Sequence, residues 1–251
     1  MERLKQFLNT FIITVVLLTS TTEAFAESPY KKNIYIAFIN RDMTKWSNVI
    51  QSIEKSDNIN TVEQKLELIN YYYGYIGYLI GKKQYEPAEK LLTKGEKLIK
   101  QVLNDSPNNA TAYSFKGTFI GFDIGINRYK AVYLGTESSF YVNKALKIDP
   151  ENIQALIDKG NILYYAPRLL GGDKKEALVY FIKGVKIIEK NKDTFHNWVY
   201  LNLLSIIASA YEKTDNLKEA KLTYEKIIRN EPDIKWVKED LYPNLLAKIK
   251  S

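Results

Sequence analysis

The segment 201–234 carries small and apolar residues at the spacing of two helices that cross closely. Leu204, Ile207 and Tyr211 follow one another at helical intervals and form a single apolar face. Ala208 and Ala220 leave room for two backbones to approach, and Pro232 cannot continue the second helix. A lone hairpin of this kind leaves its apolar face uncovered. The segment therefore predicts a fold in which helix pairs stack on one another.

Equivalent small residues recur upstream, which indicates an internal repeat. They are Gly160 and Ala177 in the unit 153–187, and Gly117 and Ser138 in the unit 110–149; the first clear unit carries Gly77, Ala88, Leu92 and Gly95. A degenerate pair of helices is expected over 27–60, where Trp46 replaces the small residue. Repeats are expected over 61–235, and an amphipathic capping helix over 236–251. Its expected apolar stripe consists of Trp236, Val237, Leu241, Leu245 and Ile249.

The residues of 201–234 resemble the 34-residue tetratricopeptide repeat at positions 4, 7, 8, 11, 20, 24, 27 and 32. The resemblance extends over roughly 61–250, with insertions in two units. It implies an all-α fold, a right-handed superhelix (α-solenoid) of stacked antiparallel helix pairs. A polar-faced terminal helix is expected to cover the last pair.

The unit 153–187 has five residues more than the standard repeat between Gly160 and Ala177. We expect Pro167 to end the first helix and Gly171 and Gly172 to form a tight turn. Asp173 should then cap the second helix, with Glu176 as its capping-box partner. The stretch 164–173 resembles a variant hairpin of exported bacterial tetratricopeptide-like proteins.

The N-terminal 26 residues have the pattern of a cleavable signal peptide. Arg3 and Lys5 precede an apolar run, which is too short to span a bilayer, and Ala24 and Ala26 mark a cleavage site. We expect cleavage after Ala26, a periplasmic or secreted location, and no transmembrane segment in the mature chain. An uncleaved membrane anchor is the alternative. The absence of cysteine excludes disulfides and thiolate chemistry.

The net charge of +7 does not come from the signal peptide, whose charges balance. Lys residues alternate with Asp and Glu along amphipathic segments, which is typical of solvated helix faces, so no nucleic-acid partner is expected. Attraction to an anionic surface is the alternative. The single histidine, His196, cannot form a usual zinc site without cysteines, and no phosphate-binding loop occurs. We therefore expect no catalytic residues, no metal and no cofactor.

The tetratricopeptide resemblance implies a concave groove lined by fixed positions of the first helix of each repeat. Those positions, together with the inserted stretch, predict the following binding residues: Tyr71, Tyr78, Gln154, Asn161, Tyr164, Tyr165 and Arg168. The lining is polar and aromatic and suits a peptide or a small polar ligand. The alternative is that the tyrosines fill the core and the groove is merely solvated. Ile157 stands where chaperone-binding members carry a clamp lysine, so that clamp is not expected.

The resulting hypothesis is an exported scaffold that holds an unidentified protein or peptide partner. A periplasmic small-ligand-binding component of a TRAP-type uptake system is one alternative, although such components usually carry a lipoprotein cysteine. A carboxylate-dependent enzyme is the other.

Overall fold

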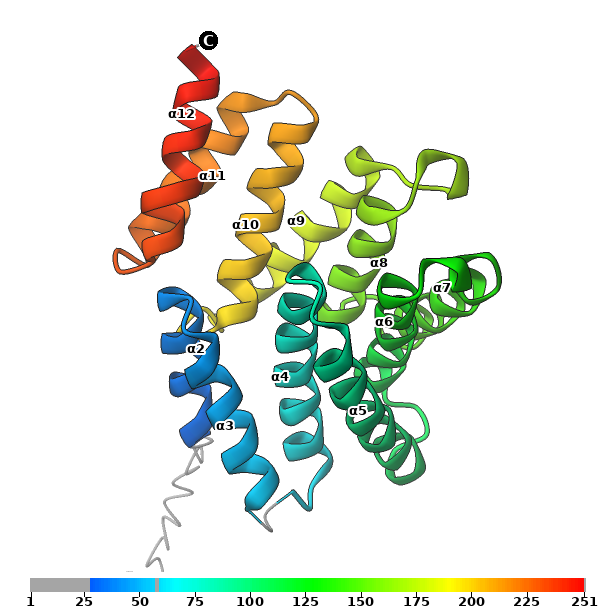
Figure 1. Ribbon diagram of the computed structural model, residues 1–251. Helices are drawn as coiled ribbons and strands as arrows, with labels where there is room; N and C mark the ends of the chain where they lie inside the picture. The colour runs from blue at the N-terminus through cyan, green and yellow to red at the C-terminus, as the bar shows by residue number, and fades with distance from the viewer. Residues whose placement is uncertain (1–27, 57–58, 251) are drawn as a thin grey trace, which may run out of the picture.

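The computed structural model describes residues 28–56 and 59–250, so the expected signal peptide lies outside the described residues. The described chain is helical and has no strand (Figure 1). Its α-helices are α2 (Pro29–Asn40), α3 (Met43–Lys55), α4 (Val62–Gly81), α5 (Tyr85–Asp105), α6 (Ala110–Ile126), α7 (Ala131–Ile148), α8 (Ile153–Tyr165), α9 (Lys174–Lys190), α10 (Trp198–Lys213), α11 (Leu217–Asn230) and α12 (Tyr242–Lys250).

Consecutive helices pack as pairs, α4 with α5, α6 with α7, α8 with α9 and α10 with α11, and the pairs stack in chain order (Figure 1). The predicted small residues, with the exception of Gly77, lie at the crossings. Ala177, Ala208 and Ala220 are fully buried, and a Cβ on Gly160 would lie 2.3 Å from Phe181 Cε1. The expected all-α solenoid of helix pairs is therefore confirmed.

The first repeat departs from the expected register. Gly77 has no atom near the position of a Cβ, so its assignment as a helix-crossing residue is wrong. Gly74, one turn earlier, packs closely instead. A Cβ there would lie 2.6 Å from the ring of Trp46 and 2.8 Å from that of Trp198. The reason is that Gly74 is the position at which α4 receives the indole rings of Trp46 from α3 and Trp198 from α10.

The helices α2 and α3 form the N-terminal pair. Asp42 caps α3 by accepting a hydrogen bond from Lys45 N, and Arg41 takes the left-handed conformation between the two helices. Trp46 is buried, and its Nε1 donates to the carbonyl oxygen of Tyr71 on α4 at 3.1 Å. A large residue at this position thus joins the pair to the next repeat.

The N-terminal pair also contacts the C-terminal helices, far away in sequence (Figure 1). Trp236 Nε1 donates to Phe38 O at 3.2 Å, and Tyr35 donates to Glu231. The rings of Phe38, Trp46, Trp198 and Trp236 meet at centroid distances between 4.9 and 6.4 Å. This aromatic cluster brings the first and last helices together.

The C-terminal segment covers the final pair, as expected for a capping element. A π-helical turn, Val237–Leu241, leads directly into α12. Val237 and Leu245 are fully buried, whereas Ile249, expected on the same stripe, is partly exposed. No helix in the described part of the chain has the length and apolar character needed to cross a membrane.

The inserted stretch between α8 and α9 has the predicted turn and N-cap. The predicted capping box does not form, because Asp173 N donates to Leu163 O at 2.9 Å and Glu176 contributes only its backbone N–H. Helix α8 ends at Tyr165, a 3₁₀ turn spans Arg168–Leu170, and Gly171 has φ +86°. A Cβ on Gly172 would lie 1.9 Å from the carbonyl oxygen of Ala166, so only glycine fits there. Asp173 Oδ1 accepts hydrogen bonds from Lys175 N and Glu176 N at 2.8 and 3.0 Å and caps α9.

Candidate functional site

The predicted binding residues lie on α4, on α8 and in the α8–α9 connection. The structure divides them into three groups. Gln154 and Asn161 join a polar network between α4, α6 and α8. Tyr164, Tyr165 and Arg168 lie at the C-terminal end of α8, while Tyr71 and Tyr78 lie elsewhere on α4.

The polar network centres on Asp158, which is buried on the inner face of α8. Ser114 Oγ donates to Asp158 Oδ2 at 2.6 Å, and Gln154 Nε2 lies 3.1 Å from both carboxyl oxygens. Burial raises the pKa of Asp158 to about 7, although hydrogen bonds from neighbours such as Ser114 and Gln154 oppose the rise. This carboxyl group therefore changes its charge close to neutral pH.

Asn161 connects the network to α4. Its Nδ2 donates to the hydroxyl oxygen of Tyr73 at 3.1 Å. Its Oδ1 is buried without a hydrogen-bond partner among the described residues, which is uncommon for a buried polar atom. When Asp158 is neutral, its carboxyl group carries a proton and can donate a hydrogen bond. Protonation therefore adds a donor to a network in which Asn161 Oδ1 is an acceptor without a partner in the described part of the chain.

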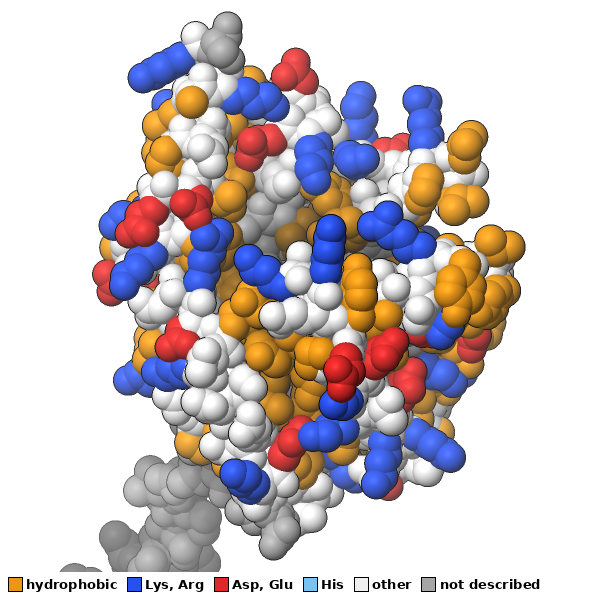
Figure 2. All heavy atoms as spheres, in the orientation of Figure 1, with side chains coloured by type: hydrophobic (Ala, Val, Ile, Leu, Met, Phe, Trp, Pro, Cys, Tyr) orange, Lys and Arg blue, Asp and Glu red, His pale blue; other side chains and the backbone are white. Residues whose placement is uncertain are grey.

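The C-terminal end of α8 is more open. Tyr164 is buried, and its hydroxyl group lies 3.1 Å from Ser209 Oγ on α10. Tyr165 is exposed and contacts Tyr164 edge to face. Two ammonium groups lie over the Tyr164 ring, Lys213 Nζ at 4.8 Å and Lys174 Nζ at 5.9 Å from its centroid. Figure 2 shows a hollow between the upper parts of α8 and α10, with Lys and Arg side chains around its rim.

The other predicted residues have contacts of their own. Tyr71 is buried, and its hydroxyl group donates to Glu67 on the same helix. Tyr78 is half-buried and stacks on Tyr75, with the ring centroids 6.0 Å apart. Arg168 is exposed in the 3₁₀ turn beyond Tyr165.

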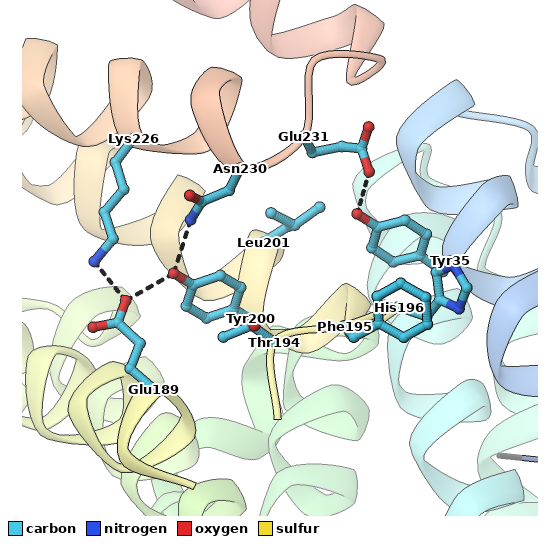
Figure 3. Close-up of a pocket in the computed structure, with 10 residues that line it drawn as sticks. All are labelled: Tyr35, Glu189, Thr194, Phe195, His196, Tyr200, Leu201, Lys226, Asn230 and Glu231. Carbon is cyan, nitrogen blue, oxygen red and sulfur yellow. Dashed lines mark hydrogen bonds and ion pairs between the residues drawn. The ribbon is translucent and has the colours of Figure 1, made fainter. Parts of the chain in front are cut away.

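A separate cavity of about 580 Å³ lies where α2, α9, the α9–α10 connection, α10 and α11 meet (Figure 3). His196 contacts two rings, Phe195 at 3.8 Å and Tyr35 at 5.3 Å between centroids. The lining residues are Tyr35, Glu189, Thr194, Phe195, His196, Tyr200, Leu201, Lys226, Asn230 and Glu231.

The polar groups of this cavity bind one another. Tyr200 donates to Glu189 Oε1 at 2.7 Å and accepts from Asn230 Nδ2 at 3.0 Å, while Lys226 pairs with the same carboxylate (Figure 3). Burial raises the pKa of Glu189, but the hydrogen bonds from Lys226 and Tyr200 outweigh it and hold that pKa below its ordinary value. No cluster of three or more potential metal-ligating side chains occurs in residues 28–56 and 59–250.

Comparison with known proteins identifies the repeat. The tetratricopeptide repeat family matches residues 201–234. A thermophilic tetratricopeptide-repeat protein of Thermus thermophilus superposes with a TM-score of 0.56 at 13% identity, over 87% of this chain and 99% of that one. The described chain thus has a tetratricopeptide-repeat-like fold.

A second solved structure shares the fold of this tetratricopeptide-like chain. The HusA haemophore from Porphyromonas gingivalis superposes with a TM-score of 0.58 at 15% identity, over 74% of this chain and 95% of that one. At such identities the likeness shows the fold alone. No curated protein matches the sequence at a significant level.

The arrangement of the helix pairs explains which site residues the sequence predicted and which it did not. Gln154 and Asn161 lie on the same inward face of α8, seven residues apart, because that spacing is two turns of one helix. Asp158 was not predicted. Its signal in the sequence is an acidic residue between Ile157 and the small residue Gly160, in a predicted helix that packs on its neighbours. The cavity was missed because its residues come from four helices and a connection and form no sequence motif.

Proposed function

We propose that this tetratricopeptide-like protein is an exported scaffold that binds a protein or peptide partner at the hollow between α8 and α10 and at the inserted stretch 164–173. The fold itself is consistent with a protein-interaction scaffold. The observation that carries the proposal is the basic and aromatic end of α8, where Tyr164 lies beneath Lys174 and Lys213.

The chemistry of this surface favours an acidic or carboxylate-bearing segment. Ammonium groups around a partly desolvated aromatic ring attract carboxylates more strongly than fully solvated ones do. Tyr165 and Arg168 extend the surface outward, since both are exposed and belong to the same connection. An aromatic side chain adds contact area with little entropy to lose, and a guanidinium group binds a carboxylate through two hydrogen bonds.

The proposed role is non-catalytic. Tetratricopeptide folds typically serve as scaffolds without enzymatic activity. The acid with the pKa nearest neutrality, Asp158, accepts hydrogen bonds from Ser114 and Gln154 rather than facing a second carboxylate across a cleft. This arrangement gives no support to the alternative of a carboxylate-dependent enzyme.

The test is affinity capture from native envelope extract, followed by quantitative mass spectrometry. We expect Tyr165→Ala and Arg168→Ala to lower the recovery of the same partner about tenfold without changing the melting temperature, because both side chains are exposed. Val179→Ala on α9 is the matched control, since Val179 is exposed but lies outside the site. Equal recovery by the two site variants and the control would contradict the proposal. N-terminal sequencing of the native protein tests export, with Glu27 expected as the first residue.

A second candidate is a small flat ligand bound in the cavity beside His196. The observation that favours it is the arrangement of Phe195, His196 and Tyr35 along one wall (Figure 3). Because one structural neighbour is a haemophore, haem is the first probe to use. A shift of the haem absorption band that His196→Ala abolishes would support this candidate. An unchanged spectrum at excess protein would rule it out for haem.

A further inference from the structure

Two neighbouring connections between helices expose apolar side chains to solvent. In the α8–α9 connection, Leu169 is 99% exposed and Leu170 is 68% exposed. In and after the 3₁₀ turn Arg128–Lys130 that joins α6 to α7, Val132 is 90% exposed and Tyr129 is exposed as well. Large apolar side chains usually pack against the core of a protein. Two neighbouring connections that both expose them indicate a surface that binds another molecule. We call these two connections the tips.

The two tips lie at the same edge of the molecule. Helices α6 and α8 are the first helices of consecutive repeats and run in the same direction, so both following connections emerge on one side (Figure 1). Figure 2 shows hydrophobic side chains gathered at the upper right, where Figure 1 places these connections. The tips can therefore reach one surface together.

Basic side chains flank each apolar tip. Arg128 is exposed beside Tyr129, and Arg168, Lys174 and Lys175 are exposed around Leu169 and Leu170. Two nearby acids are engaged within the protein, whereas Glu176 is exposed in the first turn of α9. Asp173 accepts hydrogen bonds from the first turn of α9, and Asp123 pairs with Lys130 at 2.7 Å. The tips thus combine apolar side chains with a surplus of positive charge.

We propose that these two tips, Tyr129–Val132 and Arg168–Leu170, dock the protein on the surface of a bilayer that contains anionic lipid. Leucine and valine at a loop tip enter the interface between headgroups and acyl chains, with tyrosine at the headgroup level. The flanking Arg and Lys side chains bind lipid phosphates, each contributing attraction that falls with ionic strength. The tip Arg168–Leu170 belongs to the same inserted stretch as the proposed partner site, so vesicle binding and partner capture are measured separately.

A second copy of the chain fits these tips less well. A symmetric interface would place the same basic surface, with Arg128, Arg168 and Lys175, on both sides, and like charges in contact oppose association. The apolar residues also stand on two separate projections rather than on one flat face. A bilayer accommodates projections of this kind, whereas a protein partner needs a matching pair of pockets.

The experiment measures cosedimentation of the chain that begins at Glu27, which carries every described helix, with vesicles. Phosphatidylcholine vesicles with and without phosphatidylglycerol serve as the two surfaces. We expect binding only to the vesicles with phosphatidylglycerol, and weaker binding as salt is raised. The double variant Leu169→Ser, Leu170→Ser is expected to lower the partition coefficient about tenfold or more.

The matched control is the double variant Val179→Ser, Leu222→Ser, which removes exposed apolar side chains from α9 and α11. It should bind vesicles like the wild type. Absence of binding to anionic vesicles overturns the proposal, and so does equal binding by the tip variant and the control. Concentration-dependent dimerisation that the tip variant abolishes, in the absence of vesicle binding, would assign the tips to self-association instead. Melting curves of both variants verify that they are folded.

Discussion

At the scale of single residues, the buried carboxyl group of Asp158 links pH to stability. Its pKa is raised to about 7 in the folded protein by burial, against about 3.9 in an unfolded chain. Between these values the folded state holds the proton more tightly than the unfolded state. The contribution of this proton to stability is therefore complete at acid pH and is lost as the pH rises through about 7.

We expect the substitution Asp158→Asn to remove this dependence. Relative to the variant, the wild type should lose up to about 1.4 kcal/mol of unfolding free energy per pH unit between about pH 4 and 7. Urea denaturation of both proteins across this range provides the measurement. If the two curves run parallel, the carboxyl group does not titrate in the buried network.

A pair of glycines tests the helix crossings. Ala at Gly160 would bring its Cβ into the ring of Phe181, so we expect Gly160→Ala to cost about 1 to 3 kcal/mol. Ala at Gly77 meets nothing and restores helix propensity, so Gly77→Ala should stabilise the protein by about 0.5 to 1 kcal/mol. We expect the melting temperature to fall in the Gly160→Ala variant and to rise in the Gly77→Ala variant. A loss of stability at Gly77 would restore the register that the sequence suggested.

At the scale of elements, the C-terminal cap depends on one side of a short helix. Leu245 of α12 is fully buried, whereas Ile249, one turn further, is 43% exposed. Helix α12 packs against α11, and Ile249 lies next to its C-terminal residue, Lys250. The apolar stripe read from the sequence is therefore only partly used.

Leu245→Ala is expected to lower the free energy of unfolding by about 2 to 5 kcal/mol, because it opens a cavity between α12 and α11. Ile249→Ala, which removes a similar side chain at the exposed position, should cost less than about 1 kcal/mol. Guanidinium denaturation distinguishes the two. Similar losses at both positions would mean that the whole stripe is buried in solution.

At the scale of the whole molecule, the aromatic cluster joins the first helix pair to the last. The rings of Trp46 and Trp198 meet edge to face at 4.9 Å, and Trp198 Nε1 donates to Asn70 Oδ1 at 3.0 Å. Around this cluster, α2 accepts a hydrogen bond from Trp236 and forms the exposed ion pair between Lys31 and Asp193. Such exposed pairs contribute little, so the rings provide most of the attachment.

A double-mutant cycle of Trp46→Ala and Trp198→Ala measures that attachment. We expect each substitution to cost about 3 to 5 kcal/mol and the pair to be non-additive by about 0.5 to 1.5 kcal/mol. Additive losses would show that the two rings stabilise their own helices independently and do not join the ends of the stack.

The residue pattern alone determined the repeat, the helix pairs and the inserted connection. Ala208, Ala220 and Gly160 are local markers of close crossing, and Pro167, Gly171 and Asp173 act on their own backbone, so short-range chemistry suffices to interpret them. Gln154 and Asn161 were placed on the inner face because repeat geometry assigns positions to faces.

Tertiary structure decided how the inner face is filled and which residues stay accessible. The indole rings of Trp46 and Trp198 occupy the space beside Gly74, and Asp158 acquires its raised pKa only when α4, α6 and α8 enclose it. The burial and the charge of a side chain depend on neighbours from distant segments. Helical periodicity specifies on which face of its helix a side chain lies, but not which residues cover that face. The cavity beside His196 and the closure of the first pair on the last arise from such contacts.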